Sequence, residues 1–180
     1  MKYLIVVDMQ KDFIYGALGS KEAQKIVKAV VKKIKWYMDN GYRIIFTRDT
    51  HDQDYMNTLE GQKLPVIHCV EGTDGWEIID EIKAEVDMNN DNVICINKST
   101  FGYLSWTNLP DDWRNLLEFA EEVEIIGVCT DICVVSNALI VRASYPNMKI
   151  TVDSSCCAGV TVESHEAALM TMKSCQIDVI

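Results

Sequence analysis

The feature of this sequence that most constrains its fold is a regular alternation of strand-like and helix-like segments. Short apolar runs rich in β-branched residues recur along the chain, and such runs are typical of buried parallel strands. Strands joined by helical crossovers form a parallel sheet with right-handed connections and with helices on both faces. The alternation therefore predicts a three-layer α/β/α, doubly wound fold with about six parallel strands.

The expected segments can be placed along the chain from periodicity and capping residues. We expect strands at 2–7, 42–47, 93–96, 123–128, 148–152 and 177–180. We expect helices at 21–40, 76–86, 111–120, 131–143 and 162–174, the first of them capped by Ser20. A polar segment at 48–73 is longer than most connections, and loops of that length are often functional.

Composition narrows the class of protein. A chain of 180 residues with 48% hydrophobic residues suits one core, so we expect a single domain over residues 1–180. A net charge of −10 argues against nucleic acid as a partner, because binding phosphates requires a basic surface. No apolar run approaches the ~18 residues of a membrane span, and Asp8 interrupts the apolar start too early for a signal peptide. Seven scattered cysteines indicate reduced thiols and a cytoplasmic location.

Polar residues follow several of the expected strands, at the end of the sheet where doubly wound folds bind ligands. Asp8 follows the first strand, Lys98 the third, and Cys133 the turn after the fourth. In the first turn of a helix, the Cys133 thiolate would be favoured by the helix dipole. Asp8 can act as a general base, Lys98 can hold the charges, and Cys133 can attack a carbonyl to form an acyl-enzyme. The alternative is that Cys133 packs in the core and the other two are ordinary strand-end or surface charges.

The long polar segment carries a second group of candidate residues. Asp49, His51 and His68 offer carboxylate and imidazole ligands, and Glu60 is a candidate fourth ligand. Such ligands suit zinc, iron or manganese, in an open site that keeps a position for substrate or water. The alternative is an ordinary polar loop.

These motifs together resemble the cysteine hydrolases of the isochorismatase superfamily, most closely the nicotinamidase (pyrazinamidase) branch. The resemblance covers essentially the whole chain and rests on residues 7–13, 47–51, 64–73, 98–101 and 127–134. It implies that Asp8, Lys98 and Cys133 form a catalytic triad. It also implies a cis peptide bond between Val128 and Cys129, and an oxyanion hole formed by the backbone N–H groups of Cys129 and Cys133.

The resemblance further implies a metal-assisted amidase that converts nicotinamide to nicotinate and ammonia, in NAD salvage. Zinc is the first expectation for the metal, which would bind the pyridine nitrogen, and iron and manganese are alternatives. Phe13, Leu64 and Phe101 match positions around the substrate ring. Two departures affect the pocket: the sequence at 52–56 differs from the usual pattern after His51, and Leu64 replaces an aromatic residue found in many members.

Other functions stay open at the level of sequence. The substrate of such a hydrolase could instead be another small amide, a ureide or an isochorismate-like compound. A different class is a thiol redox or metal-sensing protein, in which Cys129 and Cys133 exchange between thiol and disulfide. We interpret His165 as a capping or packing residue, and Cys156 and Cys157 as small residues at a strand end. A small amide is the expected partner, and the sequence leaves a homo-oligomer open.

Overall fold

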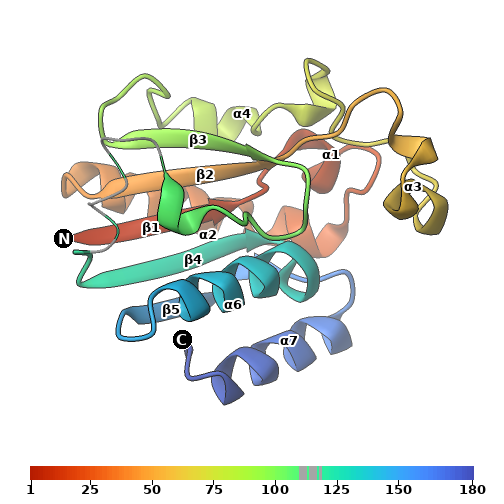
Figure 1. Ribbon diagram of the computed structural model, residues 1–180. Helices are drawn as coiled ribbons and strands as arrows, with labels where there is room; N and C mark the ends of the chain where they lie inside the picture. Colours follow the sequence, from red (N-terminus) through yellow and green to blue (C-terminus); the bar gives the residue numbers. More distant parts are fainter. Residues whose placement is uncertain (110–112, 114–116, 118) are drawn as a thin grey trace.

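The architecture is that of a single twisted sheet between helices. A computed structural model describes residues 1–109, 113, 117 and 119–180. Its six strands are all parallel and lie in the order β3-β2-β1-β4-β5-β6, and Figure 1 labels β3 to β5 of this order from top to bottom. The predicted doubly wound α/β fold is confirmed. The strands are β1 (Lys2–Val7), β2 (Arg43–Asp49), β3 (Val93–Lys98), β4 (Glu122–Val128), β5 (Lys149–Ala158) and β6 (Asp178–Val179).

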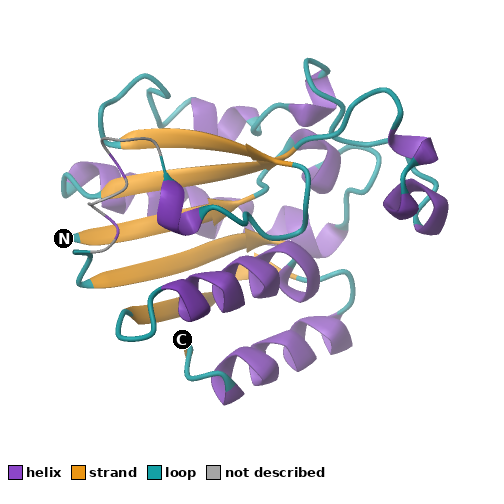
Figure 2. Cartoon of the chain, viewed as in Figure 1, coloured by secondary structure: helices purple, strands orange, loops and turns teal. Residues whose placement is uncertain are grey.

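Helices cover both faces of the sheet. Figure 1 shows α6 (Val135–Ser144) and α7 (Val162–Ser174) in front of the sheet and α2 (Lys21–Asp39) behind it. Figure 2 shows that helices and loops gather around the arrowheads of the central strands, where β1 to β4 end. Three short helices complete this part of the fold: α1 (Lys11–Ile14), α3 (Leu59–Lys63) and α4 (Asp80–Lys83). Within the described residues, no helix has the length and hydropathy that crossing a bilayer requires.

The helix α2 forms as the sequence predicts. The Ser20 side chain accepts a hydrogen bond from the backbone N–H of Ala23, which satisfies one of the free donors at the start of the helix. Ile26, Val30 and Ile34 are buried on one face because they recur at helical spacing. This face anchors the helix to the sheet.

The switch point of the sheet lies between β1 and β4, where strand order reverses. Gly127 pairs with Val7 and has a φ of 120°. A Cβ at this position would lie 2.1 Å from the Val7 carbonyl oxygen, so only glycine permits the approach. The close contact brings the end of β1 beside the end of β4.

Two predictions between β2 and β3 are wrong. The segment 48–73 is not one irregular loop: β2 continues to Asp49, and the segment then forms a 3₁₀ turn (Tyr55–Asn57) and α3. The helix expected at 76–86 is a 3₁₀ turn (Asp74–Trp76) followed by the four residues of α4. The reason is tertiary pairing, because the backbone of 77–79 bonds to that of 9–11.

The last third of the chain differs in element boundaries. The strand β5 runs to Ala158 rather than ending at residue 152, since it pairs again with β4 beyond an irregularity near Gly127. The polar Asp153 lies inside this strand and is paired with Lys33. A π-helical turn (Thr130–Val134) precedes α6, and β6 has two residues rather than four. The predicted helix at 111–120 falls mostly on residues outside those described.

Candidate active site

The carboxylate of Asp8 lies at the switch point, directly after β1. Asp8 is fully buried and has a φ of 50°, a left-handed conformation that aspartate tolerates better than most residues. Its backbone N–H donates to the Thr47 carbonyl (3.2 Å), and its Oδ1 accepts a hydrogen bond from Thr47 Oγ1 (2.6 Å). The second oxygen, Oδ2, contacts Lys98 Nζ at 2.7 Å. The carboxylate is thus held in one orientation.

The buried ammonium of Lys98 joins three groups. Its Nζ lies 2.7 Å from Asp8 Oδ2, 3.3 Å from Asp49 Oδ1 and 3.7 Å from Cys133 Sγ. Lys98 is the last residue of β3, and Cys133 lies in the π-helical turn after β4. The structure therefore brings the three residues of the expected triad together, although they come from three separate elements.

Burial and the neighbouring charges together shift the pKa values of the three residues in this trio. Burial raises the pKa of the Cys133 thiol well above its ordinary value, against the lowering effect of Lys98. Burial also raises the pKa of Asp8. For Lys98 burial acts in the lowering direction, but Asp8, Cys133 and Asp49 outweigh it and raise its pKa. Burial therefore opposes the thiolate that the start of a helix favours, and the proton of Cys133 has to be taken by a neighbouring base, as the sequence predicts for Asp8.

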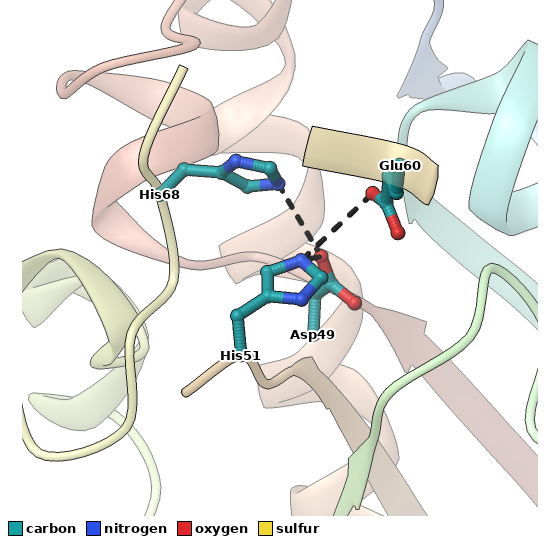
Figure 3. Close-up of side chains that lie close together, drawn as sticks. All are labelled: Asp49, His51, Glu60 and His68. Carbon is teal, nitrogen blue, oxygen red and sulfur yellow. Dashed lines mark hydrogen bonds and ion pairs between the residues drawn. The ribbon is translucent and has the colours of Figure 1, made fainter. Parts of the chain in front are cut away.

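A second group of polar side chains, shown in Figure 3, adjoins the trio through the contact of Asp49 with Lys98. One ligand atom from each of Asp49, His51, Glu60 and His68 lies within 4.8 Å of all the others. Asp49 Oδ2 is 3.0 Å from His51 Nε2 and 3.6 Å from His68 Nε2, and Glu60 Oε1 is 3.8 Å from His51 Nε2. The short helix α3 carries Glu60 to this group, so the four predicted ligands converge.

The donor atoms of this group fit a divalent metal ion. His68 Nδ1 lies 2.8 Å from the Val66 carbonyl, which can only accept, so Nδ1 carries the hydrogen and Nε2 presents a lone pair to the group. Two imidazoles and two carboxylates are a ligand set that zinc, iron and manganese all accept. Asp49 belongs to both groups, because its Oδ1 contacts Lys98 and its Oδ2 contacts the histidines.

A cavity of about 370 Å³ lies between the trio and the four candidate metal ligands Asp49, His51, Glu60 and His68, called the metal-type group below. Cys133 lines it at one side, and Asp49, Glu60 and His68 line it at another. The aromatic ring of Phe13 stands edge-on to His68, with ring centroids 5.5 Å apart. All three residues expected around a substrate ring line this cavity: Phe13, Leu64 and Phe101.

Sequence reasoning did not assign three buried polar residues that hold the site together. Thr47 binds Asp8, as described above. Gln10 accepts the backbone N–H of Asp49 (2.7 Å) and donates to its carbonyl (2.8 Å). Asn137 donates to the Cys133 carbonyl (2.8 Å) and accepts the backbone N–H of Tyr103 (2.9 Å). The one available signal was a polar Asn137 four residues after Cys133, in an otherwise mostly apolar helix.

The structure also places the other residues that the sequence singles out, around the turn after β4 and at the end of β5. The Val128–Cys129 peptide bond is cis, as the resemblance implies. Burial raises the pKa of Cys129 to about 12, which leaves little thiolate for the redox alternative. His165 Nδ1 lies 2.8 Å from Thr130 Oγ1, so His165 packs on the turn that carries Cys133. Buried Cys156 and Cys157 lie two residues and one residue from the end of β5.

Comparisons with known proteins agree with this architecture. The model of the isochorismatase domain matches residues 2–180. The nicotinamidase of Schizosaccharomyces pombe is 27% identical over 98% of this chain and 91% of its own. Two solved structures, each 28% identical and covering 99% of this chain and 98% of their own, are similar. They are the nicotinamidase/pyrazinamidase of Bacillus subtilis (TM-score 0.87) and the pyrazinamidase of Pyrococcus horikoshii in complex with zinc (TM-score 0.81).

The family model spans nearly the whole chain, and the Bacillus subtilis structure shares its fold over 99% of this chain. The protein belongs to the isochorismatase family and is a hydrolase of that family.

Proposed function

We propose that this protein is a metal-assisted cysteine amidohydrolase that converts nicotinamide to nicotinate and ammonia. One observation carries the proposal: Cys133 lines the same cavity as three of the four members of the metal-type group, Asp49, Glu60 and His68. A pyridine carboxamide has an amide at one position of its ring and a nitrogen at another, and these two groups of residues suit its two polar ends. The similarity to nicotinamidases supports the same substrate.

The residues of the trio would carry the chemistry. Asp8 takes the thiol proton while Cys133 Sγ attacks the amide carbon, and Lys98 holds both in place. The negative charge that develops on the amide oxygen is accepted by the backbone N–H groups of Cys129 and Cys133. When the C–N bond breaks, Asp8 gives its proton to the leaving nitrogen, and ammonia departs. A water molecule, deprotonated by Asp8, then attacks the thioester, releases nicotinate and restores the thiol.

The second group would position the ring. Asp49, His51, Glu60 and His68 would hold a divalent metal ion, which would supply a Lewis acid for the pyridine nitrogen. We propose zinc, because a similar pyrazinamidase is described in complex with zinc, and the ligands also suit iron and manganese. Phe13, Leu64 and Phe101 would enclose the ring. A reducing cytoplasm, where NAD salvage takes place, would keep the nucleophile as a thiol.

Ammonia release from nicotinamide by the purified, metal-loaded protein tests the proposal. We expect turnover by the wild type and none by Cys133→Ala, since no other group replaces the attacking sulfur. Activity that survives Cys133→Ala would contradict the mechanism. Turnover of another amide or a ureide, with none of nicotinamide, would keep the mechanism and replace the substrate. Mass spectrometry of the oxidised protein adds a further arm, because a reversible Cys129–Cys133 disulfide with no amidase activity would favour the redox alternative.

A further inference from the structure

Two hollows adjoin at the active site. The inner one is the catalytic cavity of about 370 Å³, and the outer one is a groove of about 520 Å³ between α3 and the segment after β3. The outer groove is lined by Leu59 and Lys63 of α3 and by Ser99 and Thr100. The four residues common to both hollows are Glu60, Leu64, Phe101 and Ile132. The groove is therefore continuous with the place where the substrate reacts.

The outer groove has an apolar lining that is open to solvent. Leu59 is 71% exposed, Phe101 48% and Leu64 38%. Exposed apolar side chains that cluster beside a ligand cavity are typical of a binding surface. Leu64 and Phe101 line both hollows, so an occupant of the groove would meet the same two apolar side chains as the substrate ring.

We propose that the groove is a subsite for an apolar substituent on the substrate, so that the enzyme also hydrolyses pyridine carboxamides carrying an alkyl or aryl group. This inference rests on the proposed function. The inner cavity has Cys133 on one side and the metal-type group on another, which fixes two positions of the ring. A substituent that leaves the ring towards Leu64 and Phe101 passes over them and contacts Leu59. The residues common to both hollows favour a substrate over a protein partner, because the occupant of the groove would touch the substrate ring.

The test compares nicotinamide with nicotinamides that carry a methyl, propyl or phenyl group at ring carbon 5 or 6. For at least one position we expect kcat/KM of the phenyl compound to lie within about tenfold of that of nicotinamide. Leu59→Ser should then lower kcat/KM for the phenyl compound about fivefold and leave nicotinamide unchanged, because only the substituent loses an apolar contact. Leu104→Ser is the matched control, since Leu104 is a 72% exposed leucine that lines neither hollow.

Each other result overturns the inference or its premise. If the wild type does not hydrolyse nicotinamide, the proposed function is wrong. If it hydrolyses nicotinamide but neither substituted series, the function stands and this inference is wrong. An equal loss for both substrates in Leu59→Ser would also contradict it. If Leu59→Ser keeps the wild-type kcat/KM for both substrates, the inference is wrong. If its molar mass by light scattering also differs from that of the wild type, the groove is a contact between copies of the chain.

Discussion

At the scale of single residues, one hydroxyl helps Lys98 to keep the proposed base charged. Thr47 Oγ1 donates to Asp8 Oδ1 at 2.6 Å, and this bond lowers the pKa of Asp8 against the larger raising effect of burial. In Thr47→Val the bond is lost, so the pKa of Asp8 rises further. Because Asp8 must be ionised to take the thiol proton, the acidic limb of the kcat/KM profile should move to higher pH. We also expect kcat/KM at pH 7 to fall about tenfold or more.

A profile of kcat/KM against pH checks this prediction. Thr47→Ser keeps the hydroxyl and should restore the wild-type limb. A limb that stays in place in Thr47→Val would mean that another group controls the acidic side. In that case Thr47 would be a packing residue.

A single residue could be assigned from the sequence when its type and its position at a strand end already indicate its role. Asp8, Lys98 and Cys133 could be singled out because strand ends of a parallel sheet converge, and acid, base and nucleophile are recognisable residue types. Thr47 could not, because a threonine in a strand is ordinary until its neighbour is known to be a buried carboxylate. The sequence shows a helix start near Cys133 but not the depth of burial that raises the pKa of its thiol.

At the scale of elements, Asp12 connects α1 to the segment that carries the histidines. Its Oδ2 accepts the backbone N–H of Cys69 (2.8 Å), and the Cys69 carbonyl accepts the backbone N–H of His51 (3.0 Å). Cys69 has a φ of 47° and follows His68 directly. Asp12→Ala should therefore weaken metal binding about 10–100-fold, because the positions of both histidines depend on this link. Competition with a chelator for manganese or zinc measures the change.

Two further variants separate this effect from general damage. A Cβ on Gly75 would lie 2.2 Å from Asp12 Oδ2, so Gly75→Ala should displace the carboxylate and weaken metal binding in the same direction. Asp74→Asn is the control, since that carboxylate is 84% exposed and pairs with Lys11. Wild-type metal affinity in both Asp12→Ala and Gly75→Ala would contradict the positioning role.

Elements were predictable where local pattern and tertiary packing agree. The helix α2 matches because its apolar face packs on the sheet, and the strand β1 matches because its continuous apolar run is buried within the sheet. The segment 76–86 does not match: Ile78 pairs with Gln10 across an antiparallel bridge, which its helical periodicity does not reveal. The end of β5 was misplaced because Asp153 has the appearance of a polar break, although Lys33 on a distant helix pairs with it.

At the scale of the whole molecule, Lys33 links the helical layer to the sheet. Its Nζ lies 2.5 Å from Glu124 Oε1 and 2.8 Å from Asp153 Oδ2. Although burial acts to raise the pKa of Asp153, hydrogen bonds from Lys33 and Ser155 hold it below its ordinary value. A depressed carboxyl pKa stabilises the fold above the unfolded pKa of about 3.9, and this contribution is lost as pH falls through the folded pKa.

Lys33→Met should lower the free energy of unfolding by about 3 kcal/mol at pH 7, because it leaves buried carboxylates without their cation. The loss should be smaller at pH 4, where Asp153 can protonate. Urea unfolding at the two pH values measures it, with Lys32→Met as control, since Lys32 is the exposed neighbour of Lys33 on α2. An equal loss at both pH values would show that packing of the lysine stem, not charge, is what Lys33 contributes.

Metal binding should also stabilise the whole molecule, because the four ligands come from three segments, at 49–51, in α3 and at His68, that converge only in the folded chain. Above the dissociation constant, each tenfold rise in free metal should add about 1.4 kcal/mol to the free energy of unfolding. Manganese is the cleaner probe, since cysteines of the unfolded chain bind zinc. His51→Ala should lose this dependence, and Cys133→Ala should keep it, because the sulfur is not among the four ligands. If the free energy of unfolding of His51→Ala depends on metal as in the wild type, the metal binds elsewhere. If Cys133→Ala loses this dependence, the thiol is one of the ligands.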